Sequence, residues 1–271
     1  MCKYFSYNGI NTNTILEQPL MLVSFDRESE YEVFSKELLK TEKSVKNYKS
    51  KTYASKFTDD LTFDIVLIKQ DFKRFTKEEF RKISSSLLSV DEDMKLEFHS
   101  DDEVINTYFL GQFTSITETV ADGIAAISCT FENNSQFSYE DKTYSTTCAT
   151  EKILVYECDS DIKNGFIYPK LTLVANESGT ITIQNMSDTV EINSMNITLN
   201  KNVKTIIDCD NCIIYDSLGT IIDYEDLGFT DVTSLYWLRF LSGNNSLKLV
   251  GNFNMTIDTV LPREEGVPTC Y

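Results

Sequence analysis

Histidine is nearly absent from this chain of 271 residues, which contains a single one, His99. Catalysis by histidine is therefore nearly excluded by counting. His99 precedes Ser100, Asp101 and Asp102, so a general base oriented by a carboxylate is one interpretation. No nucleophile elbow, phosphate-binding loop or dinucleotide fingerprint accompanies it. We interpret His99 as a strand-end residue on a polar face, and we predict no enzyme, no catalytic residue and no cofactor.

Basic residues are also few, because 25 Lys and Arg stand against 42 Asp and Glu, a formal net charge of −17. A nucleic-acid-binding protein neutralises phosphates with clustered Lys and Arg, and a surplus of carboxylates repels the same polymer. We therefore expect no nucleic acid and no membrane among the partners. Apolar runs such as Leu20–Val23 fall far short of the roughly 20 residues that span a bilayer. Residues 1–10 lack a secretory signal, so we expect a soluble chain that no cleaved signal exports.

Closely spaced cysteines are limited to one pair, Cys209-Asp-Asn-Cys212. The pair could be half of a zinc site or a redox motif, but the additional ligands that zinc requires are not visible in the sequence. Asp210-Asn211 suits a two-residue turn, so we predict paired hairpin positions for the two cysteines and no metal site. The odd total and scattered spacing exclude a disulfide framework, and we interpret the cysteines as reduced thiols. The seven are Cys2, Cys129, Cys148, Cys158, Cys209, Cys212 and Cys270.

Calcium loops of the EF-hand type are lacking as well. Acidic clusters at 91–93, 101–103 and 223–226 could bind Ca²⁺, but none has the required spacing, and we interpret them as solvated loop charge. Two carboxylates that converge in space, as glycoside hydrolases use, stay an open alternative that sequence spacing cannot reveal. Trp237 is the one indole and could stack on a sugar if exposed. Its apolar neighbours in Leu235–Leu241 favour burial at the edge of a sandwich.

Aromatic residues are abundant, with 17 Phe and 14 Tyr, and the length suits one large or two ordinary folded domains. Residues 1–135 contain 16 basic and 23 acidic side chains, whereas residues 136–271 contain 9 and 19 and are richer in Thr, Ile and Val. The polar stretch Glu132–Gln136 marks the change. We predict a mainly β protein with domains 1–135 and 136–271. An alternative in which the last strand returns to the first domain stays open.

One helix, at about 76–88, is expected in the first domain. Thr76-Lys-Glu-Glu79 forms a capping box, and Phe75 and Phe80 occupy the two positions of a hydrophobic staple. Apolar residues then follow at helical spacing, which gives one face suited to packing on a sheet. We therefore predict a β-sheet or split-barrel-like domain with one packed helix.

The remaining periodicity is that of strands. In the first domain we predict strands at 61–68, 94–99, 104–120 and 124–131, the last two joined by a hairpin turn at Asp122-Gly123. The densely charged 26–51 segment is interpreted as an exposed loop or a projecting hairpin arm. Short strands between turn signals predict an antiparallel β-sandwich for the second domain. These strands are expected at 171–175, 180–185, 189–192, 196–199, 204–209, 212–215, 220–222, 247–250 and 255–257, with a turn at 242–245.

Taken together, four features resemble those of a known family. They are Phe5–Ile10, an aromatic strand that leads to Asn-Gly; Tyr53–Lys69, followed by the Phe75–Leu88 helix; Tyr108–Ile116 with the strand Ala125–Phe131; and Trp237–Val250. In their order and spacing these features resemble the distal tail protein family of bacteriophages that infect Gram-positive bacteria, which is also found in contractile tail-like particles. The resemblance implies a galectin-like shape for the second domain.

The resemblance also implies a structural role in a virion, at the tail tip or baseplate. Members form a homo-hexameric ring at the end of the tail tube, which implies the tail tube protein, a tail-associated or baseplate hub protein and a receptor-binding protein as partners, with assembly in the cytoplasm of the bacterial host. Exposed strand edges in residues 1–135 and the 26–51 arm suit such a ring, because they are templates for pairing with a neighbour. Two alternatives stay open: a carbohydrate-binding module that recognises bacterial wall glycan, and a β-rich wall hydrolase.

Overall fold

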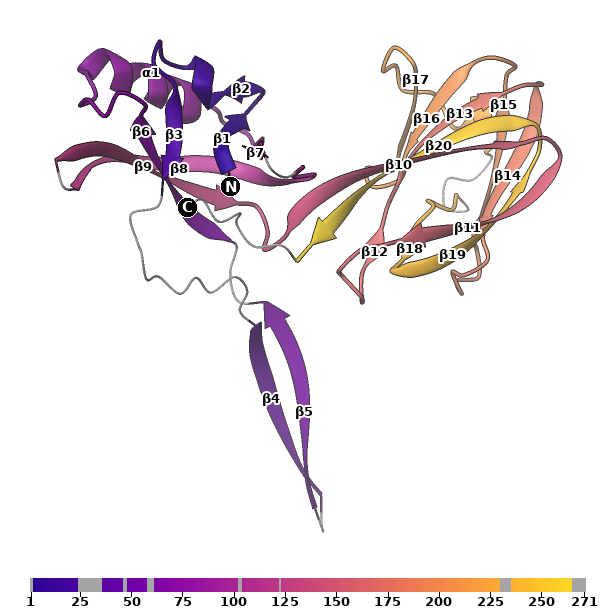
Figure 1. The fold of residues 1–271 in the computed structure, drawn as a ribbon. Helices are drawn as coiled ribbons and strands as arrows, with labels where there is room; N and C mark the ends of the chain where they lie inside the picture. The colour runs from indigo at the N-terminus through magenta and orange to yellow at the C-terminus, as the bar shows by residue number, and fades with distance from the viewer. Residues whose placement is uncertain are drawn as a thin grey trace. The chain divides into compact units, whose positions relative to one another are not determined.

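The computed structural model describes residues 2–23, 36–45, 48–57, 61–101, 104–121, 123–229 and 235–264 (Figure 1). These residues form two compact units, the first reaching Tyr139 and including Glu264, and the second spanning Glu140–Arg263. Antiparallel strands dominate both units, which confirms the mainly β fold class. Within these ranges no helix is long and apolar enough to cross a membrane.

The first unit is a curved antiparallel sheet with one packed helix, as the sequence predicts. Its strand order is β3-β6-β9-β8-β7-β1-β2. The sheet is curled, so that β1 also contacts β3. Helix α1 packs near β8. The elements are β1 (Cys2–Tyr7), β2 (Ile10–Asn11), a 3₁₀ turn (Thr12–Thr14), β3 (Leu20–Val23), β6 (Thr62–Lys69), α1 (Lys77–Leu87), β7 (Met94–Ser100), β8 (Thr107–Ala121) and β9 (Ile124–Asn133).

Aromatic side chains fill the inner face of this sheet. Phe113 stacks on Phe5 at 5.7 Å between ring centroids and meets the edge of Phe131 at 5.1 Å. Tyr7 lies edge-on to Phe113 at 4.9 Å, and its buried hydroxyl donates to the carbonyl of Gly111. Gly111 allows β8 and β9 to approach, since a Cβ at this position would lie 2.0 Å from the Glu132 carbonyl oxygen. The phenylalanine-rich composition thus supplies the first core.

Helix α1 begins as its sequence dictates. The Thr76 hydroxyl accepts from the Glu79 amide at 3.2 Å, and the Glu79 carboxylate accepts from the Thr76 amide at 2.7 Å. Phe75 and Phe80 form the staple, with ring centroids 5.5 Å apart. The buried ammonium of Lys69, at the end of β6, donates to the same Glu79 carboxylate at 3.2 Å. One carboxylate therefore caps the helix and ties it to the sheet.

Two hairpins of the first unit follow the sequence pattern closely. Strands β8 and β9 pair up to Ala121↔Ile124, and Gly123 has the positive φ of 83° that a tight turn requires. Strands β4 (Lys36–Val45) and β5 (Tyr48–Phe57) pair with each other over ten residues and form a separate two-stranded sheet (Figure 1). The expected 26–51 arm thus contains a hairpin, while its residues 26–35 and 46–47 lie outside the described residues.

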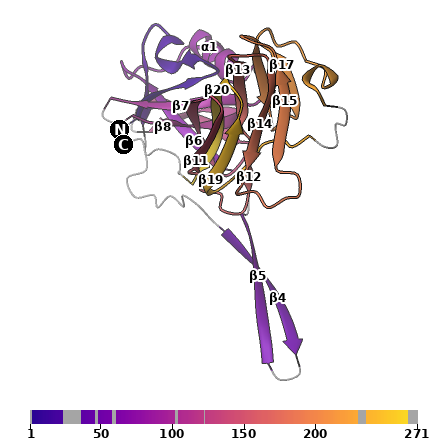
Figure 2. The same ribbon diagram turned by 90° about the vertical axis from the view of Figure 1, so that its right-hand side faces the viewer.

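The second unit contains two antiparallel sheets (Figure 2). A five-stranded sheet has the order β17-β16-β13-β20-β10, and a four-stranded sheet has the order β11-β19-β14-β15. Strands β12 (Phe166–Ile167) and β18 (Phe240–Leu241) form a short pair. The other elements are β10 (Ser138–Cys148), β11 (Glu151–Cys158), β13 (Lys170–Ala175), β14 (Gly179–Asn185), β15 (Ser194–Leu199), β16 (Lys204–Asp208), β17 (Ile213–Asp216), a 3₁₀ turn (Glu225–Leu227), β19 (Gly243–Val250) and β20 (Phe253–Arg263).

The two sheets of the second unit enclose one apolar core, which confirms the predicted sandwich. Inward positions alternate along each strand, as in β13, where Leu171 and Leu173 are fully buried between partly exposed neighbours. Buried residues of both sheets join one cluster, for example Leu173 and Met255 with Ile183 and Leu249. The outward faces carry ladders of short polar side chains, such as Ser145 with Thr256 at 3.0 Å.

Several strand predictions in the second unit are wrong. Residues 189–192 form a loop, because Asp188 turns back on Asn185 through a backbone hydrogen bond of 3.2 Å. Residues 220–222 make one isolated bridge, Tyr215↔Ile221. The turn predicted at 242–245 is confined to a bend at Ser242, because β19 already begins at Gly243, where it pairs with Cys158 of β11. Both β10 and β11 were missed, since β10 is largely polar and shows no apolar alternation.

Replacement of Thr76 by Ala is expected to weaken the start of α1 by about 1 kcal/mol, because the Glu79 amide loses its acceptor. Hydrogen exchange of the α1 amides should become about fivefold faster, whereas Thr76→Ser keeps the acceptor and the native rate. Unfolding followed by Trp237 fluorescence reports on the second unit and should not change. Unaltered α1 exchange in Thr76→Ala would show that the capping box does not stabilise the helix.

Candidate functional site

The single histidine lies in a polar cross-strand cluster of the first unit. His99 on β7 is hydrogen-bonded through Nε2 to the Ser6 hydroxyl on β1 at 2.9 Å, and its ring stacks on Tyr4. The Ser6 hydroxyl also donates to Glu97 at 3.2 Å. Of the two carboxylates that follow His99 in the sequence, Asp101 forms an ion pair with Lys3, and Asp102 lies outside the described residues. Histidine and carboxylate therefore both bond to one serine in a ladder on the sheet surface, which differs from a carboxylate-oriented base.

The cysteine pair does not form a metal-binding geometry. Strands β16 and β17 pair up to Asp208↔Ile213, so Cys209 and Cys212 lie within a four-residue loop, and the predicted paired hairpin positions are wrong. The Asn211 amide bonds to Asp208 instead and closes this longer loop. Cys209 is buried, and burial raises the pKa of its thiol, while Cys212 is exposed with a φ of 56°. The two sulfurs therefore have very different surroundings.

Acidic side chains do not gather into a cation site in the described part of the chain. Among those residues, no group of three or more His, Cys, Asp or Glu side chains is placed to hold a metal ion. The clusters at 91–93 and 223–226 are mainly exposed, while 102–103 of the third cluster lie outside the described residues. Asp93 accepts from Gln112 at 3.2 Å and thus contributes to the sheet surface.

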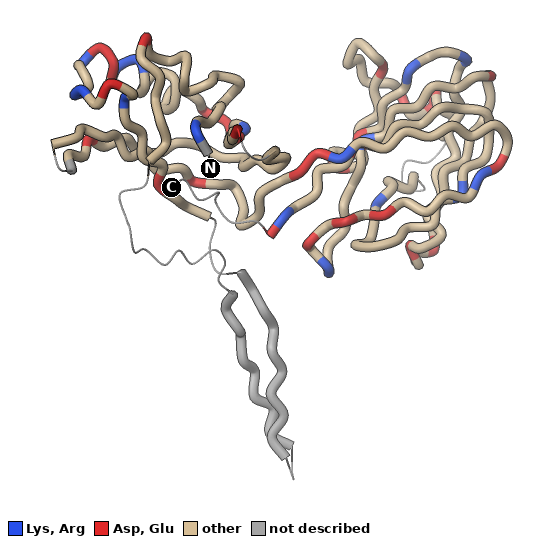
Figure 3. Tube along the Cα trace, in the orientation of Figure 1, with Lys and Arg blue, Asp and Glu red and all other residues tan. Residues whose placement is uncertain are grey.

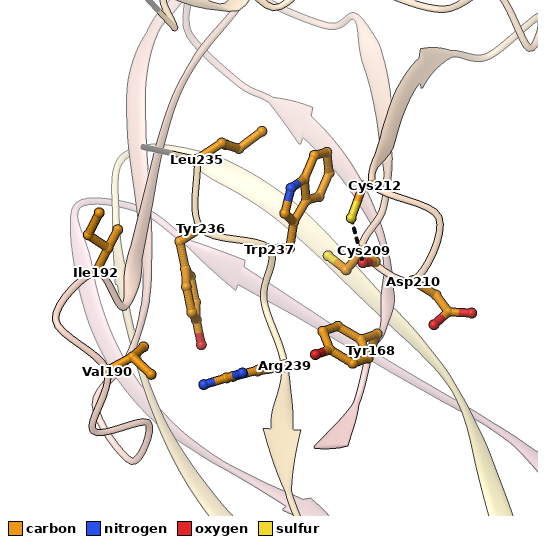
Figure 4. Close-up of a pocket in the computed structure, with 10 residues that line it drawn as sticks. All are labelled: Tyr168, Val190, Ile192, Cys209, Asp210, Cys212, Leu235, Tyr236, Trp237 and Arg239. Carbon is orange, nitrogen blue, oxygen red and sulfur yellow. Dashed lines mark hydrogen bonds between the residues drawn. The ribbon is translucent and has the colours of Figure 1, made fainter. Parts of the chain in front are cut away.

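A pocket of about 530 Å³ lies in the second unit, beside the loop that carries Trp237 (Figure 4). Trp237 is partly buried, and its ring meets the edge of Tyr224 at 6.3 Å. The predicted burial of this indole at the margin of the sandwich is therefore only partial. Aliphatic side chains supply one wall, and Arg239 and Asp210 supply charge. The lining residues are Tyr168, Val190, Ile192, Cys209, Asp210, Cys212, Leu235, Tyr236, Trp237 and Arg239.

A buried ion pair supports one wall of this pocket. Asp188 is 4% exposed and accepts from Arg239 Nε at 2.7 Å and from the Tyr236 hydroxyl at 2.9 Å. Hydrogen bonds from Arg239, and then from Tyr236, hold the pKa of the Asp188 carboxyl below its usual range against the effect of burial. The Arg239 guanidinium also lies over the Phe166 ring at 3.9 Å. The polar groups here are therefore largely engaged with one another.

Sequence reasoning considered Trp237 as a sugar platform but favoured its burial, predicted no pocket, and missed Asp188, Tyr236 and Arg239. The alternation Tyr236-Trp-Leu-Arg239 was a usable signal, since it places Tyr236 and Leu238 inward and Trp237 at the surface. Asp188 gave no signal, because its partners are about 50 residues away in the sequence. In the structure, the hydrogen-bonded group of Asp188, Tyr236 and Arg239 braces one side of an open pocket.

Two protein-family models match this chain. The model of a phage tail protein N-terminal domain matches residues 1–135, and that of a phage tail C-terminal domain matches residues 137–259. The chain belongs to the phage tail protein family. A search of curated protein sequences finds no match. The two family models confirm the resemblance to phage tail proteins drawn from the sequence.

Solved structures share the fold of this phage tail protein at low sequence identity. The Dit (gp 19.1) protein of phage SPP1, described as a paradigm of the hub adsorption apparatus in phages that infect Gram-positive bacteria, is 15% identical, with a TM-score of 0.64 over 96% of this chain and 100% of its own. A chain of the phage P2 baseplate in its activated conformation with Ca is 9% identical, with a TM-score of 0.51 over 98% and 99% of the two chains. The likeness extends over both units.

The Asp188 ion pair should give the second unit a pH-dependent stability. A carboxyl with a lowered folded pKa stabilises the fold above its unfolded pKa of about 3.9, and this contribution is lost as pH falls through the folded pKa. The stability advantage of the wild type over Asp188→Asn should thus be constant above about pH 5 and vanish in acid, as measured by urea unfolding with Trp237 fluorescence. The exposed Asp226→Asn control should follow the wild type. An advantage that persists in acid would contradict the ion pair's role.

The two loop cysteines should differ in reactivity. Mass-mapped alkylation of the native protein at pH 8 should modify Cys212, while Cys209 should react only after denaturation, since its raised pKa and burial keep the thiol protonated and inaccessible. Zinc should not protect Cys212. Rapid modification of Cys209, or protection of both thiols by zinc, would indicate a functional dithiol.

Proposed function

We propose that six copies of this phage tail protein form a ring at the distal end of the tail tube and serve as the attachment hub for baseplate or tail-tip proteins. The observation that carries the proposal is the whole-chain fold likeness to the SPP1 Dit protein, which is described as a hub. The partners are the tail tube protein on one side and a tail-associated or baseplate hub protein on the other, with a receptor-binding protein as a further candidate. The chain acts in the virion after assembly in the host cytoplasm.

The β4–β5 hairpin supports ring formation through the first unit. In the described sheets, these two strands pair only with each other. Residues 36–57 contain seven Lys and two Glu, a net charge of +5 in a chain of −17, so the other residues carry −22. A basic hairpin on an acidic protein has a complementary surface on every neighbouring copy. In a closed ring each hairpin contacts the next copy once, so every hairpin has a binding partner.

The structural role agrees with the chemistry of the described residues better than the alternatives do. A wall hydrolase needs two carboxylates with separate roles, but the buried carboxylate beside the pocket, Asp188, is engaged with Arg239 and Tyr236. A glycan-binding module needs free aromatic faces, but of the three aromatic residues that line the pocket only Tyr168 is exposed, while Trp237 is partly buried and Tyr236 lies in the core. We therefore place the function in surfaces and strand edges.

The assembly state tests the ring. Light scattering of the purified chain, alone or with its tail tube protein, should reach six times the 31.0 kDa chain mass, and electron microscopy should show rings. Lys49→Glu with Lys51→Glu should weaken assembly at least tenfold, because the net charge of residues 36–57 falls from +5 to +1 and most of the attraction to the acidic neighbour is lost. Lys77→Glu with Lys82→Glu makes the same change of charge on α1 and should assemble like the wild type.

A chain that stays monomeric with the tube protein and is absent from tail tips would overturn the ring. Rings that form equally well after both charge reversals would retain the ring but refute the role of the hairpin.

A further inference from the structure

Strand β11 is an open edge of the four-stranded sheet in the second unit. Its eight residues pair with β19 from Glu151↔Val250 to Cys158↔Gly243, and in the described sheets β11 has no second partner strand. An edge strand presents unpaired backbone N–H and C=O groups, which are a template for another strand. This edge is long and regular, since the register with β19 is continuous.

The outward face of β11 is unusual for its sheet because it is apolar at the centre. Leu154 and Tyr156 point into the core, whereas Ile153 and Val155 are 60% and 63% exposed. Outward positions on the other strands of this sheet are mostly short polar residues, for example the hydrogen-bonded pair Thr182 and Asn196. Two adjacent aliphatic side chains at an open edge are a small docking surface of the kind that sheet edges avoid when they have no partner.

Acidic residues bracket this aliphatic pair. The outward positions of β11 read Glu151, Ile153, Val155 and Glu157 in succession, all exposed. Lys248 on β19 pairs with Glu151 at 3.2 Å, at the surface. Figure 3 shows that most positions along the second-unit strands are neither acidic nor basic.

The spacing of the glutamates disfavours a second copy of the chain as the occupant. In a fully overlapping antiparallel pair of β11 strands, centred on Leu154, each Glu151 would face Glu157 of the other copy. Like charges directly opposite each other destabilise a sheet. A shift of two residues in either direction would place a glutamate opposite Ile153 or Val155 instead. The same face suits a strand that offers aliphatic side chains at its centre and positive charge at its ends.

We propose that the β11 edge binds an extended segment of a partner protein, by strand addition, in which aliphatic side chains alternate along one face with Lys or Arg at each end. Main-chain hydrogen bonds supply affinity, and the Glu-Ile-Val-Glu face selects the sequence. The net −10 of residues 136–271 favours the approach of a basic partner. The inference rests on the proposed attachment role and specifies where a tail-tip protein attaches and what chemistry its attaching segment has.

A designed strand probes this edge directly. The probe is a disulfide-cyclised hairpin that displays Arg-Thr-Val-Thr-Ile-Thr-Arg, and the control replaces both Arg by Glu. We expect amide shifts of the full-length protein confined to β11 and neighbouring β19, slower exchange of the β11 amides, and binding about tenfold tighter for the Arg probe than for the Glu probe. Glu151→Lys with Glu157→Lys should invert this preference, which a non-specific apolar contact would not do.

Matched variants separate the contribution of the aliphatic side chains to probe binding from that of the glutamates. Ile153→Thr with Val155→Thr should abolish binding of the Arg probe while keeping strand propensity, whereas Val260→Thr removes an exposed aliphatic group from β20 and should change nothing. Equal binding of both probes, or shifts outside β11 and β19, would overturn the proposal. If the wild type self-associates and the double substitution Ile153→Thr with Val155→Thr abolishes this, the occupant of the edge is a second copy of the chain. That result would also overturn the proposal.

The glutamates give a second, independent readout. Glu151→Thr with Glu157→Thr removes the like-charge opposition and should raise the average mass above that of the wild type at equal concentration. An unchanged mass would contradict the role of the charges. The variants on β11 should leave ring formation intact, so failure of strand capture with rings present refutes this inference alone, and loss of rings with probe binding intact refutes the ring alone.

Discussion

Both units of this phage tail protein depend on the same constraint: an antiparallel sheet alternates its side chains, so it can bury one face only if something covers that face. The first unit covers it by curling the sheet around phenylalanine rings and adding α1. The second unit covers it with another sheet. In each case the fold leaves outward faces and strand edges, and these are the surfaces through which such a protein can assemble.

Polar interactions then decide where these sheets are joined and braced. Lys69 and Glu79 are the clearest case, because one carboxylate completes the capping box and also accepts from a buried ammonium at the end of β6. Asp188 plays a comparable part in the second unit, where it joins a loop after β14 to Tyr236 and Arg239. A charge removed from water in this way is costly unless it is paired, so each network specifies one arrangement of its loops.

Local signals explain which parts of the fold were accessible from the sequence. The helix was predictable because Thr76, Glu79 and the Phe75–Phe80 pair act over a few residues. The turn at Gly123 was equally local. Strand β10 was not predictable, because its polar residues gain their β conformation from pairing with β20 more than 100 residues away. The loop at 189–192 shows the converse, since residues with strand propensity are held by the contacts of Asp188 and Asn193.

The sequence by itself determined the mainly β class and the helix with its cap. These conclusions rest on composition and short-range spacing. The tertiary structure decided which strands lie at edges, that Cys209 and Cys212 face different surroundings, and that Asp188, Tyr236 and Arg239 meet. It also placed Ile153 and Val155 on the surface between two glutamates, where alternation alone could not tell the inner face from the outer. A strand lies at an edge when no other strand pairs with one of its sides. Edge strands can therefore be identified only once the pairing of all the other strands is known.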